Sequence, residues 1–327
     1  RLRFPAALLL AALCSGAASA AEQTATTALP VLQVPMGARA TGMGGAFTAV
    51  ATDVTALWYN PAGLARLNAQ ELSLGLIAGA GESDIQNFGW AGPLPLSGVS
   101  GNGYSSFGAN LLIAQKGTIE VNTLKADGSL GSTSKQSAGG DLIFSGGYAE
   151  RAGTMGLELR DGSYTLDHYL GVGGKLARSS IVGHTATTFA GDLGYLLHVP
   201  ELGWSFGASA LNAGGKLRYI DDADPLPLIL RGGAAWQGGA AGRHNLLAGL
   251  DGDYVLQEKA WHVNAGVEYF LQRMYGARVG YQFHRDDGGL TIGLGLRWKG
   301  RWLIDYGWAL GGDLGATHRF TFTYRFG

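Results

Sequence analysis

The C-terminal half of the chain is a succession of stretches of about ten residues in which large apolar side chains occupy every second position. The last stretch, 317–326, is the clearest, because Phe320, Phe322, Tyr324 and Phe326 alternate with polar or charged residues. Successive side chains of a strand point to opposite faces, so each stretch predicts a strand with one apolar and one polar face. The repeated pattern favours an all-β fold, a transmembrane antiparallel β-barrel of about 14 strands whose apolar face meets lipid.

The predicted strands alternate with connections of unequal length. Short connections at 199–203, 271–273 and 299–301 are typical of the periplasmic side of such a barrel, and long ones at 115–138 and 213–227 of the outer side. The linkers 93–103 and 152–168 are longer than this rule predicts. The expected strands are 71–80, 85–92, 104–114, 139–151, 169–179, 186–198, 204–212, 228–236, 244–254, 260–270, 274–283, 289–298, 302–309 and 317–326.

The N-terminus has the features of a secretory signal peptide. Arg1 and Arg3 precede an apolar run at 4–13, and small residues at 18–20 suit cleavage. The only cysteine, Cys14, lies in this segment, where it is either removed with it or carries a lipid anchor, and Leu13 is large for the latter. We therefore expect a signal peptide at 1–20, an N-terminal extension and hatch at 21–68, and a barrel at 69–327, located in the outer membrane of a Gram-negative-type bacterium.

Composition restricts the class of protein further. Charged residues make up only 15% of the chain, and without Arg1 and Arg3 there are 22 basic against 25 acidic residues. Nothing in this balance favours a nucleic-acid partner. No uninterrupted apolar run of about 18 residues follows the signal, which argues against a transmembrane helix. A closed barrel then remains as the way to satisfy every backbone hydrogen-bonding group in a bilayer.

Tryptophans cluster at the ends of the predicted strands, where an aromatic girdle would meet lipid headgroups. The alternative is that they cap the core of a soluble sandwich. The girdle residues are Trp204, Trp236, Trp261, Trp298, Trp302 and Trp308.

Charged residues fall on the opposite, lumen-facing side of the last strands. They are Glu268, Arg278, Arg297, Asp305 and Arg325. One interpretation is a ladder of inner-wall salt bridges that also anchors the hatch through Asp53 or Arg39. The other is a ring that selects an anionic head group such as a carboxylate, for which arginine is well suited.

The stretch 35–65 is rich in small residues and does not read as a strand. It suits a compact coil that plugs a barrel, with a short helix somewhere within 47–58. Asn60-Pro61 would initiate a helical turn that Gly63 can end. The predicted hatch residues are Arg39, Gly42, Gly44, Gly45, Asp53, Asn60, Pro61 and Gly63, and glycines on the inner wall would let such a plug approach.

Motifs for chemistry are weak. Gly42-Met-Gly44-Gly45 lacks the strand that precedes a dinucleotide loop, and Gly173-Gly-Lys175 lacks the rest of a Walker loop. The histidines are scattered, no Gly-x-Ser-x-Gly occurs, and the acidic loop around Asp222 is either solvated or a divalent-cation site. We predict no catalytic residue, no metal, no cofactor and no enzymatic activity.

The motifs Gly37-Ala-Arg-Ala-Thr-Gly-Met-Gly-Gly-Ala-Phe47 and Asn60-Pro-Ala-Gly-Leu64, with Asp53, resemble the hatch of FadL-like outer-membrane proteins, and more closely the PorV/PorQ branch. The similarity continues through Asn212-Ala-Gly-Gly215, Pro225-Leu-Pro-Leu228, Gly266-Val-Glu-Tyr269, Arg278-Val-Gly-Tyr281, Asp305-Tyr306 and Leu314-Gly-Ala-Thr-His-Arg-Phe320. The resemblance implies a fourteen-stranded barrel with an N-terminal hatch, and two possible functions.

The first function is passive passage of a hydrophobic small molecule across the outer membrane with gating by the hatch. It predicts an apolar pocket lined by residues 57–67 and lumen aromatics. The second is a type IX secretion component that binds cargo or the translocon through its loops. It predicts a filled lumen and an exposed apolar loop surface near 225–227. Membrane lipid is a partner in both.

Overall fold

The computed structural model describes residues 27–80, 83–101, 105–125, 130–239, 243–285, 288–311 and 315–327. The predicted signal peptide and Cys14 lie outside these ranges. Within them, none of the helices is both long and apolar enough to cross a membrane.

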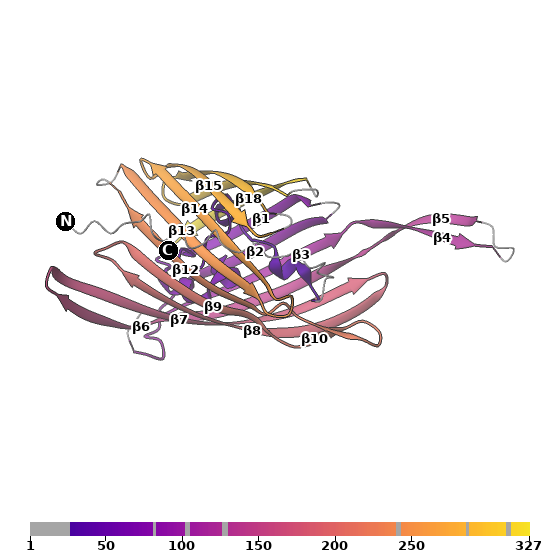
Figure 1. Ribbon diagram of the computed structural model, residues 1–327, viewed down its shortest axis with the longest axis horizontal. Coiled ribbons are helices and arrows are strands. Elements are labelled where there is room, and N and C mark those ends of the chain that lie inside the picture. The colour runs from indigo at the N-terminus through magenta and orange to yellow at the C-terminus, as the bar shows by residue number, and fades with distance from the viewer. Residues whose placement is uncertain are drawn as a thin grey trace.

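Fourteen strands form one closed antiparallel barrel, in which β1 (Gln70–Ala80) pairs with β18 (Ala316–Phe326) to complete the wall (Figure 1). The prediction of a 14-strand barrel is confirmed, and each predicted stretch corresponds to one strand of the wall. The other barrel strands are β2 (Ser83–Leu94), β3 (Ser105–Lys116), β6 (Gly139–Leu159), β7 (Gly162–Ile181), β8 (His184–Val199), β9 (Trp204–Gly214), β12 (Ile229–Gly238), β13 (His244–Val255), β14 (Ala260–Leu271), β15 (Tyr275–Phe283), β16 (Leu290–Trp298) and β17 (Trp302–Leu310).

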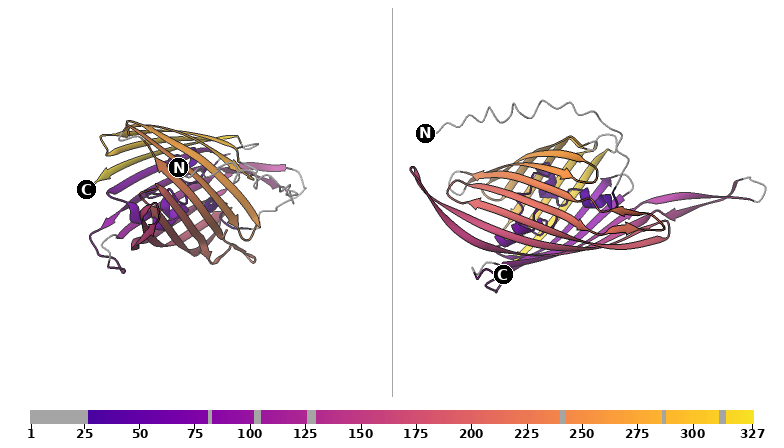
Figure 2. Two further views of the ribbon diagram at one scale, coloured as in Figure 1. Left: turned by 60° about the vertical axis from the view of Figure 1, so that its left-hand side comes forward. Right: turned by 60° about the horizontal axis from the view of Figure 1, so that its bottom comes forward.

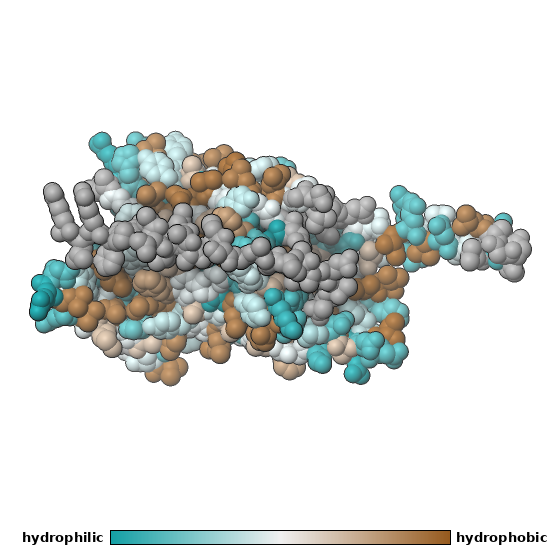
Figure 3. All heavy atoms as spheres, in the orientation of Figure 1, coloured by the Kyte–Doolittle hydropathy of each residue, from teal (hydrophilic) through white to brown (hydrophobic). Residues whose placement is uncertain are grey.

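Alternation of side chains gives the wall an apolar outer face. On β16, Ile292 and Leu294 are 43% and 58% exposed, whereas Thr291 between two such positions is fully buried. The closing pair repeats this, with Leu74 opposite Phe322 on the outside and Ser73 opposite Thr323 on the inside. Hydrophobic residues cover much of the visible wall in Figure 3, and hydrophilic residues gather mainly toward its ends.

The barrel has two distinguishable ends. We call the end that carries the connections 200–203, 272–274 and 299–301 the short-turn end, and the opposite one the long-loop end. Two hairpins occupy the long connections at the latter: β4 (Thr118–Leu124) with β5 (Leu130–Ser137), and β10 (Lys216–Arg218) with β11 (Ala223–Pro225). The β4–β5 hairpin projects well beyond the wall in Figure 1.

The predicted linker 152–168 is wrong, because these residues continue β6 and β7 as a hairpin that turns at Arg160 and Asp161. A bulge between Arg151 and Gly153 shifts the register there. Since a one-residue shift exchanges the faces of a strand, the bulge broke the alternation on which the prediction relied.

Residues 28–67, which we call the lumen segment, lie inside the barrel (Figure 2). The segment contains four short helices, η2 (Pro30–Gln33), α2 (Ala38–Gly42), α3 (Ala56–Tyr59) and η3 (Pro61–Arg66), and most of its side chains are buried. Its first residues lie at the long-loop end, where the Ala28 N–H donates to the Pro225 carbonyl. Its last residues lead into β1 at the short-turn end.

Local structure in the lumen segment agrees with the sequence in part. Asn60 caps η3 through a 3.1 Å bond from the Ala62 N–H to its side-chain oxygen, and Pro61 occupies the first helical position. Gly63 was predicted to end the helical turn, but it lies within η3. A Cβ at Gly63 would meet the Ala51 carbonyl oxygen at 2.2 Å, so close backbone approach explains this glycine. Of the stretch 47–58, only residues from Ala56 onward are helical.

Candidate functional site

Glycines on the inner wall allow the lumen segment to lie directly against the strands. A Cβ at Gly266 would lie 2.2 Å from the Met43 carbonyl oxygen, and one at Gly280 would lie 2.2 Å from the Gly44 nitrogen. A side chain at either position would therefore overlap the backbone of the segment. The wall glycines in contact with the segment are Gly89, Gly108, Gly147, Gly171, Gly194, Gly207, Gly233, Gly249, Gly266, Gly280, Gly293 and Gly307.

The predicted hatch glycines meet this wall from the other side. A Cβ at Gly42 would lie 2.9 Å from the Gly293 Cα, and one at Gly44 would lie 2.7 Å from the Ala265 carbonyl oxygen. Gly44 and Gly45 also have positive φ angles of 67° and 84°, which side chains other than glycine rarely adopt. Both close approach and backbone conformation thus require glycine at this turn.

Polar side chains of the wall accept hydrogen bonds from buried backbone N–H groups of the segment. The Asp251 carboxylate on β13 accepts 2.7 Å bonds from the N–H groups of Phe47 and Thr48. Glu71 on β1 accepts a 2.7 Å bond from the Val54 N–H. These bonds satisfy backbone N–H groups that lie in turns, where no regular helix provides an acceptor.

Asn60 links the segment to itself and to the wall. Its amide nitrogen donates to the Thr48 carbonyl at 3.0 Å and to the Tyr195 carbonyl on β8 at 2.9 Å. Its side-chain oxygen meanwhile caps η3. One buried side chain therefore fixes two turns of the segment against β8.

An ion-pair network joins the segment to the last strands. Arg39 binds Glu268 on β14 through two parallel 2.8 Å bonds, from Nε to Oε2 and from Nη2 to Oε1. Arg278 on β15 contacts the same carboxylate at 2.6 Å and Asp305 on β17 at 2.7 Å. The sequence predicted these charges on the inner wall, and the structure brings them together.

Arg39 rather than Asp53 makes the ionic contact with the wall. Asp53 pairs with Arg39 itself, at 3.8 Å, and its Oδ1 accepts bonds from the N–H and hydroxyl of Thr55. Burial lowers the pKa of the Arg39 guanidinium, but the carboxylates of Glu268 and Asp53 outweigh it and raise the pKa above its ordinary value. Arg39 is therefore a permanent cation inside the barrel.

The other predicted lumen arginines differ in their partners. Arg325 pairs with Glu71 at 3.1 Å. Arg297 lies 3.8 Å from the centre of the Phe270 ring, and no carboxylate of the described chain lies within 4 Å of it. It thus lines the lumen without joining the predicted ladder.

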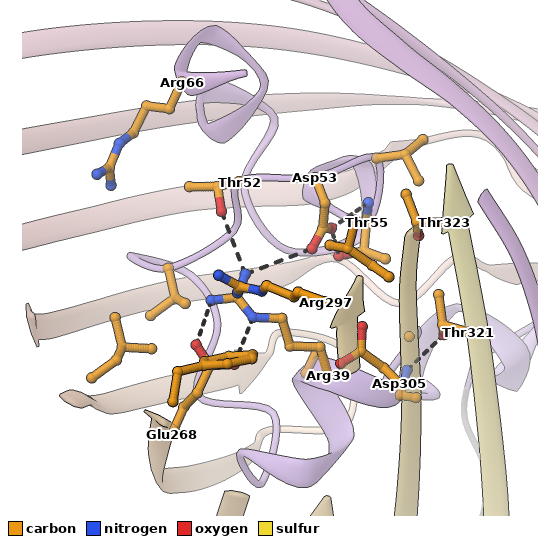
Figure 4. Close-up of a pocket in the computed structure, with 18 of the residues that line it drawn as sticks. Arg39, Thr52, Asp53, Thr55, Arg66, Glu268, Arg297, Asp305, Thr321 and Thr323 are labelled. Atoms are coloured by element: carbon orange, nitrogen blue, oxygen red, sulfur yellow. Dashed lines mark hydrogen bonds and ion pairs between the residues drawn. The ribbon is translucent and has the colours of Figure 1, made fainter. Parts of the chain in front are cut away.

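A polar chamber of about 170 Å³ remains between the lumen segment and the wall at the short-turn end (Figure 4). Its lining includes Arg39, Arg66, Glu268, Arg297 and Arg325, together with Gln237, Asn245, Ser205, Glu71, Asp53 and Asp305. Figure 4 shows Arg66 of η3 extending away from the ion pairs that hold Arg39.

The prediction of an apolar pocket lined by residues 57–67 is wrong for this chamber. Of that stretch, only Arg66 lines it. Leu57 and Leu64 instead pack on glycines of the wall. A Cβ at Gly147 would lie 2.5 Å from the Leu57 side chain, and one at Gly108 would lie 3.0 Å from that of Leu64. The leucines fill the space that a ligand was expected to occupy.

The predicted exposed apolar surface near 225–227 is also wrong. Leu226 and Pro227 are buried. Leu226 belongs to one apolar cluster with Leu217 of β10 and with Val31 and Leu32 of η2. Leu217 of the hairpin and Leu226 after it are therefore buried with the lumen segment, whereas Ile220 in the turn of the hairpin is 65% exposed.

The six predicted girdle tryptophans lie near strand ends, at positions that alternate with the buried inner-face residues. Trp204 opposes Trp236 and Trp298 opposes Trp302, all at the short-turn end. Trp261 and Trp308 lie toward the long-loop end. The barrel thus carries aromatic side chains at both rims of its apolar face.

Three residues of the site were missed in the sequence. Glu71 and Asp251 stand at inner-face positions of alternating strands, so the alternation itself would have found them. Arg66 carries no such signal, because it is the last residue of η3, a short helix whose direction depends on tertiary contacts.

The sequence profile of UPF0164, an uncharacterised protein family, matches residues 8–207, which is more than half of the chain. The chain belongs to UPF0164. A comparison with curated protein sequences gives no match.

The UPF0164 barrel is similar to solved structures at low sequence identity. The toluene transporter TbuX of Ralstonia pickettii matches with a TM-score of 0.57 and 14% identity, over 89% of this chain and 98% of that one. The toluene transporter TodX of P. putida matches with a TM-score of 0.56 and 13% identity, over the same shares. A Pseudomonas aeruginosa FadL homologue has a TM-score of 0.48 at 11% identity, over 89% and 98%. The first two support the fold, a closed antiparallel barrel.

Proposed function

We propose that this protein is an outer-membrane channel for small hydrophobic molecules, in which the lumen segment acts as a hatch. The segment fills the lumen with buried side chains, so a solute passes only when the segment moves. The observation that carries the proposal is the closed barrel with an apolar outer wall, a fold that it shares with the toluene transporters TbuX and TodX. The filled lumen alone would also suit the secretion alternative.

Three further features support it. The apolar outer wall with aromatic rims suits insertion in a bilayer, and the predicted signal peptide at 1–20 suits export to the outer membrane. Apolar residues of η2, β10 and the following loop gather at the long-loop end, where a hydrophobic solute would enter. The fold of TbuX and TodX, which are toluene transporters, points to monoaromatic hydrocarbons as a first substrate class to test. Membership of the PorV/PorQ branch remains a proposal that rests on the sequence motifs.

A disulfide between segment and wall tests the proposal. A Cβ at Gly249 on β13 would lie 3.5 Å from the Ala46 Cβ, which is within the range for a disulfide. In cells that express the Ala46→Cys/Gly249→Cys variant, uptake of a labelled monoaromatic hydrocarbon should fall to the level of cells without the protein. Uptake should recover when the disulfide is reduced. Each single substitution is the control. Equal uptake by the oxidised double variant and the wild type would refute gating by this segment.

A further inference from the structure

Four basic residues lie in three successive connections at the short-turn end of the barrel. Arg243 ends the connection between β12 and β13, and Arg273 lies between β14 and β15. Lys299 and Arg301 lie between β16 and β17, on either side of a glycine. The connections read Gly-Ala-Ala-Gly-Arg, Gln-Arg-Met and Lys-Gly-Arg, so none of them contains an acidic residue. We call these four residues the basic row.

Backbone hydrogen bonds place the three connections side by side. The Gln272 N–H donates to the Arg243 carbonyl at 2.6 Å, which joins the first connection to the second. The Arg297 N–H, on the strand that leads into the third connection, donates to the Met274 carbonyl at 2.8 Å. The basic row therefore follows one continuous arc of the rim.

The charges of the basic row are exposed and are not neutralised by neighbouring side chains. All four residues are exposed, and none of the ion pairs between described residues involves them. The acidic residues in the other connections at this end are Asp161, between β6 and β7, and Glu201, between β8 and β9. Positive charge is therefore concentrated on the arc from β12 to β17.

Two residues of the basic row occupy backbone positions that favour smaller side chains. Arg273 and Lys299 have positive φ angles of 55° and 50°. Each lies in a tight turn beside a second residue with positive φ, Gln272 or Gly300. Glycine and asparagine are the usual residues in such turns, because most L residues are strained there. The turn alone therefore does not explain a long cationic side chain at either position.

Aromatic side chains of the outer wall flank the basic row. Trp298 and Trp302 directly precede and follow the third connection and oppose each other across the two strands. The Lys299 ammonium lies 4.8 Å from the centre of the Trp298 ring. Tyr275, directly after the second connection, is 55% exposed. Tryptophan and tyrosine concentrate at the head-group level of a bilayer, which places the basic row at the level of the lipid phosphates.

We infer that the basic row binds the head groups of anionic phospholipids in the leaflet at the short-turn end. Lysines and arginines beside a membrane attract anionic lipids, by roughly fivefold in affinity for each cation. The basic row adjoins the apolar wall through the tryptophans, so a lipid whose acyl chains contact the wall places its phosphate beside the row. The inference rests on the outer-membrane location within the proposed function, but not on the passage of any solute.

The test is the thermal unfolding midpoint of the full protein in dodecyl maltoside, titrated with phosphatidylglycerol at constant ionic strength. A ligand that binds only the folded state raises this midpoint in a saturable way. We expect saturable stabilisation by phosphatidylglycerol beyond that by phosphatidylcholine with the same acyl chains. Soluble glycerol phosphate, which lacks acyl chains, should give no saturable shift over the same concentrations.

Two variants each remove half of the basic row. Arg273→Asn/Lys299→Asn suits the backbone, because asparagine tolerates positive φ. This variant should be at least as stable as the wild type in phosphatidylcholine, and its half-saturating concentration of phosphatidylglycerol should be roughly 25-fold higher. Arg243→Gln/Arg301→Gln should weaken the response by a similar factor.

The matched control is Arg218→Gln/Lys259→Asn, which removes two exposed cations at the long-loop end. Lys259 also has a positive φ angle, of 53°, so the control repeats the backbone change. This variant should bind phosphatidylglycerol as the wild type does. An equal loss of binding in the control and in the row variants would overturn the location.

Three other results would overturn the inference. Equal stabilisation of the wild type by the two phospholipids would exclude recognition of the head-group charge. An equal shift with glycerol phosphate would make free phosphate, not lipid, the ligand. A lipid response that is unchanged in both row variants would leave a protein with an acidic surface as the occupant of the basic row.

Failure of the proposed function gives a different result. A barrel that inserts into phosphatidylcholine vesicles but shows no preference for phosphatidylglycerol refutes the role of the basic row alone. A barrel that inserts into vesicles of neither lipid refutes the outer-membrane location itself.

Discussion

Alanine at Gly280 tests whether the glycine wall holds the lumen segment. The added Cβ would lie 2.2 Å from the Gly44 nitrogen and 2.3 Å from the Met43 carbonyl carbon. Both are backbone atoms, so no side-chain rotation relieves the overlap. Overpacking of this kind costs about 1–3 kcal/mol.

Part of that cost is offset, because alanine in a strand interior is favoured over glycine by roughly 0.5–1 kcal/mol. A net cost of about 0.5–2 kcal/mol changes an equilibrium about 2- to 30-fold. Gly280→Ala should therefore raise the population of barrels with a displaced segment by that factor. The barrel strands themselves should remain folded, since the overlap is with the segment alone.

Cysteine labelling measures this population. The only cysteine of the chain is Cys14, within the predicted signal peptide, so Thr48→Cys introduces a single buried thiol. Its reaction rate with a polar maleimide should rise about 2- to 30-fold in Gly280→Ala, in proportion to the displaced fraction. Gly252→Ala is the control, because no heavy atom lies within 4 Å of a Cβ at that position. Equal labelling rates in the two alanine variants would refute the packing argument.

Three other substitutions test separate contacts. Glu268→Gln should destabilise the barrel in detergent more than Arg39→Gln does, since Glu268 binds two arginines. Removing one partner of a buried pair costs about 3–5 kcal/mol. Equal midpoints of thermal unfolding for the two variants would contradict this prediction. Leu294→Arg, on the exposed outer face of β16, should lower the folding stability in lipid vesicles by about 2–4 kcal/mol, whereas Thr133→Arg on the projecting β5 should not. The heat-dependent shift in electrophoretic mobility reports folding. Unchanged folding of Leu294→Arg would argue against lipid at this face. Asn60→Ala removes the cap of η3 and the bonds to Thr48 and Tyr195, and should lower the stability of the packed segment by about 1–3 kcal/mol. Limited proteolysis should then cleave the segment faster. Protection equal to that of the wild type would show that the cap is dispensable.

Strand register explains why most of the barrel could be predicted and one part could not. On β14, Trp261 and Val267 point outward while His262 and Glu268 point inward, as alternation required. The bulge at Arg151 exchanged the faces of β6 and hid the remaining nine or so residues of that strand from the same argument.

The sequence by itself determined the barrel, its strand number and the inner placement of the charges, because a period of two is a local property of each strand. Tertiary structure alone decided which charges meet, since Glu268 and Arg278 become neighbours through strand register and Arg39 reaches them across more than two hundred residues. It also decided that Arg66 and Arg297 line one chamber, in which no carboxylate of the described residues lies within 4 Å of either guanidinium. Contacts between distant segments depend on how the wall closes around the lumen segment, and no local pattern of residues records that closure.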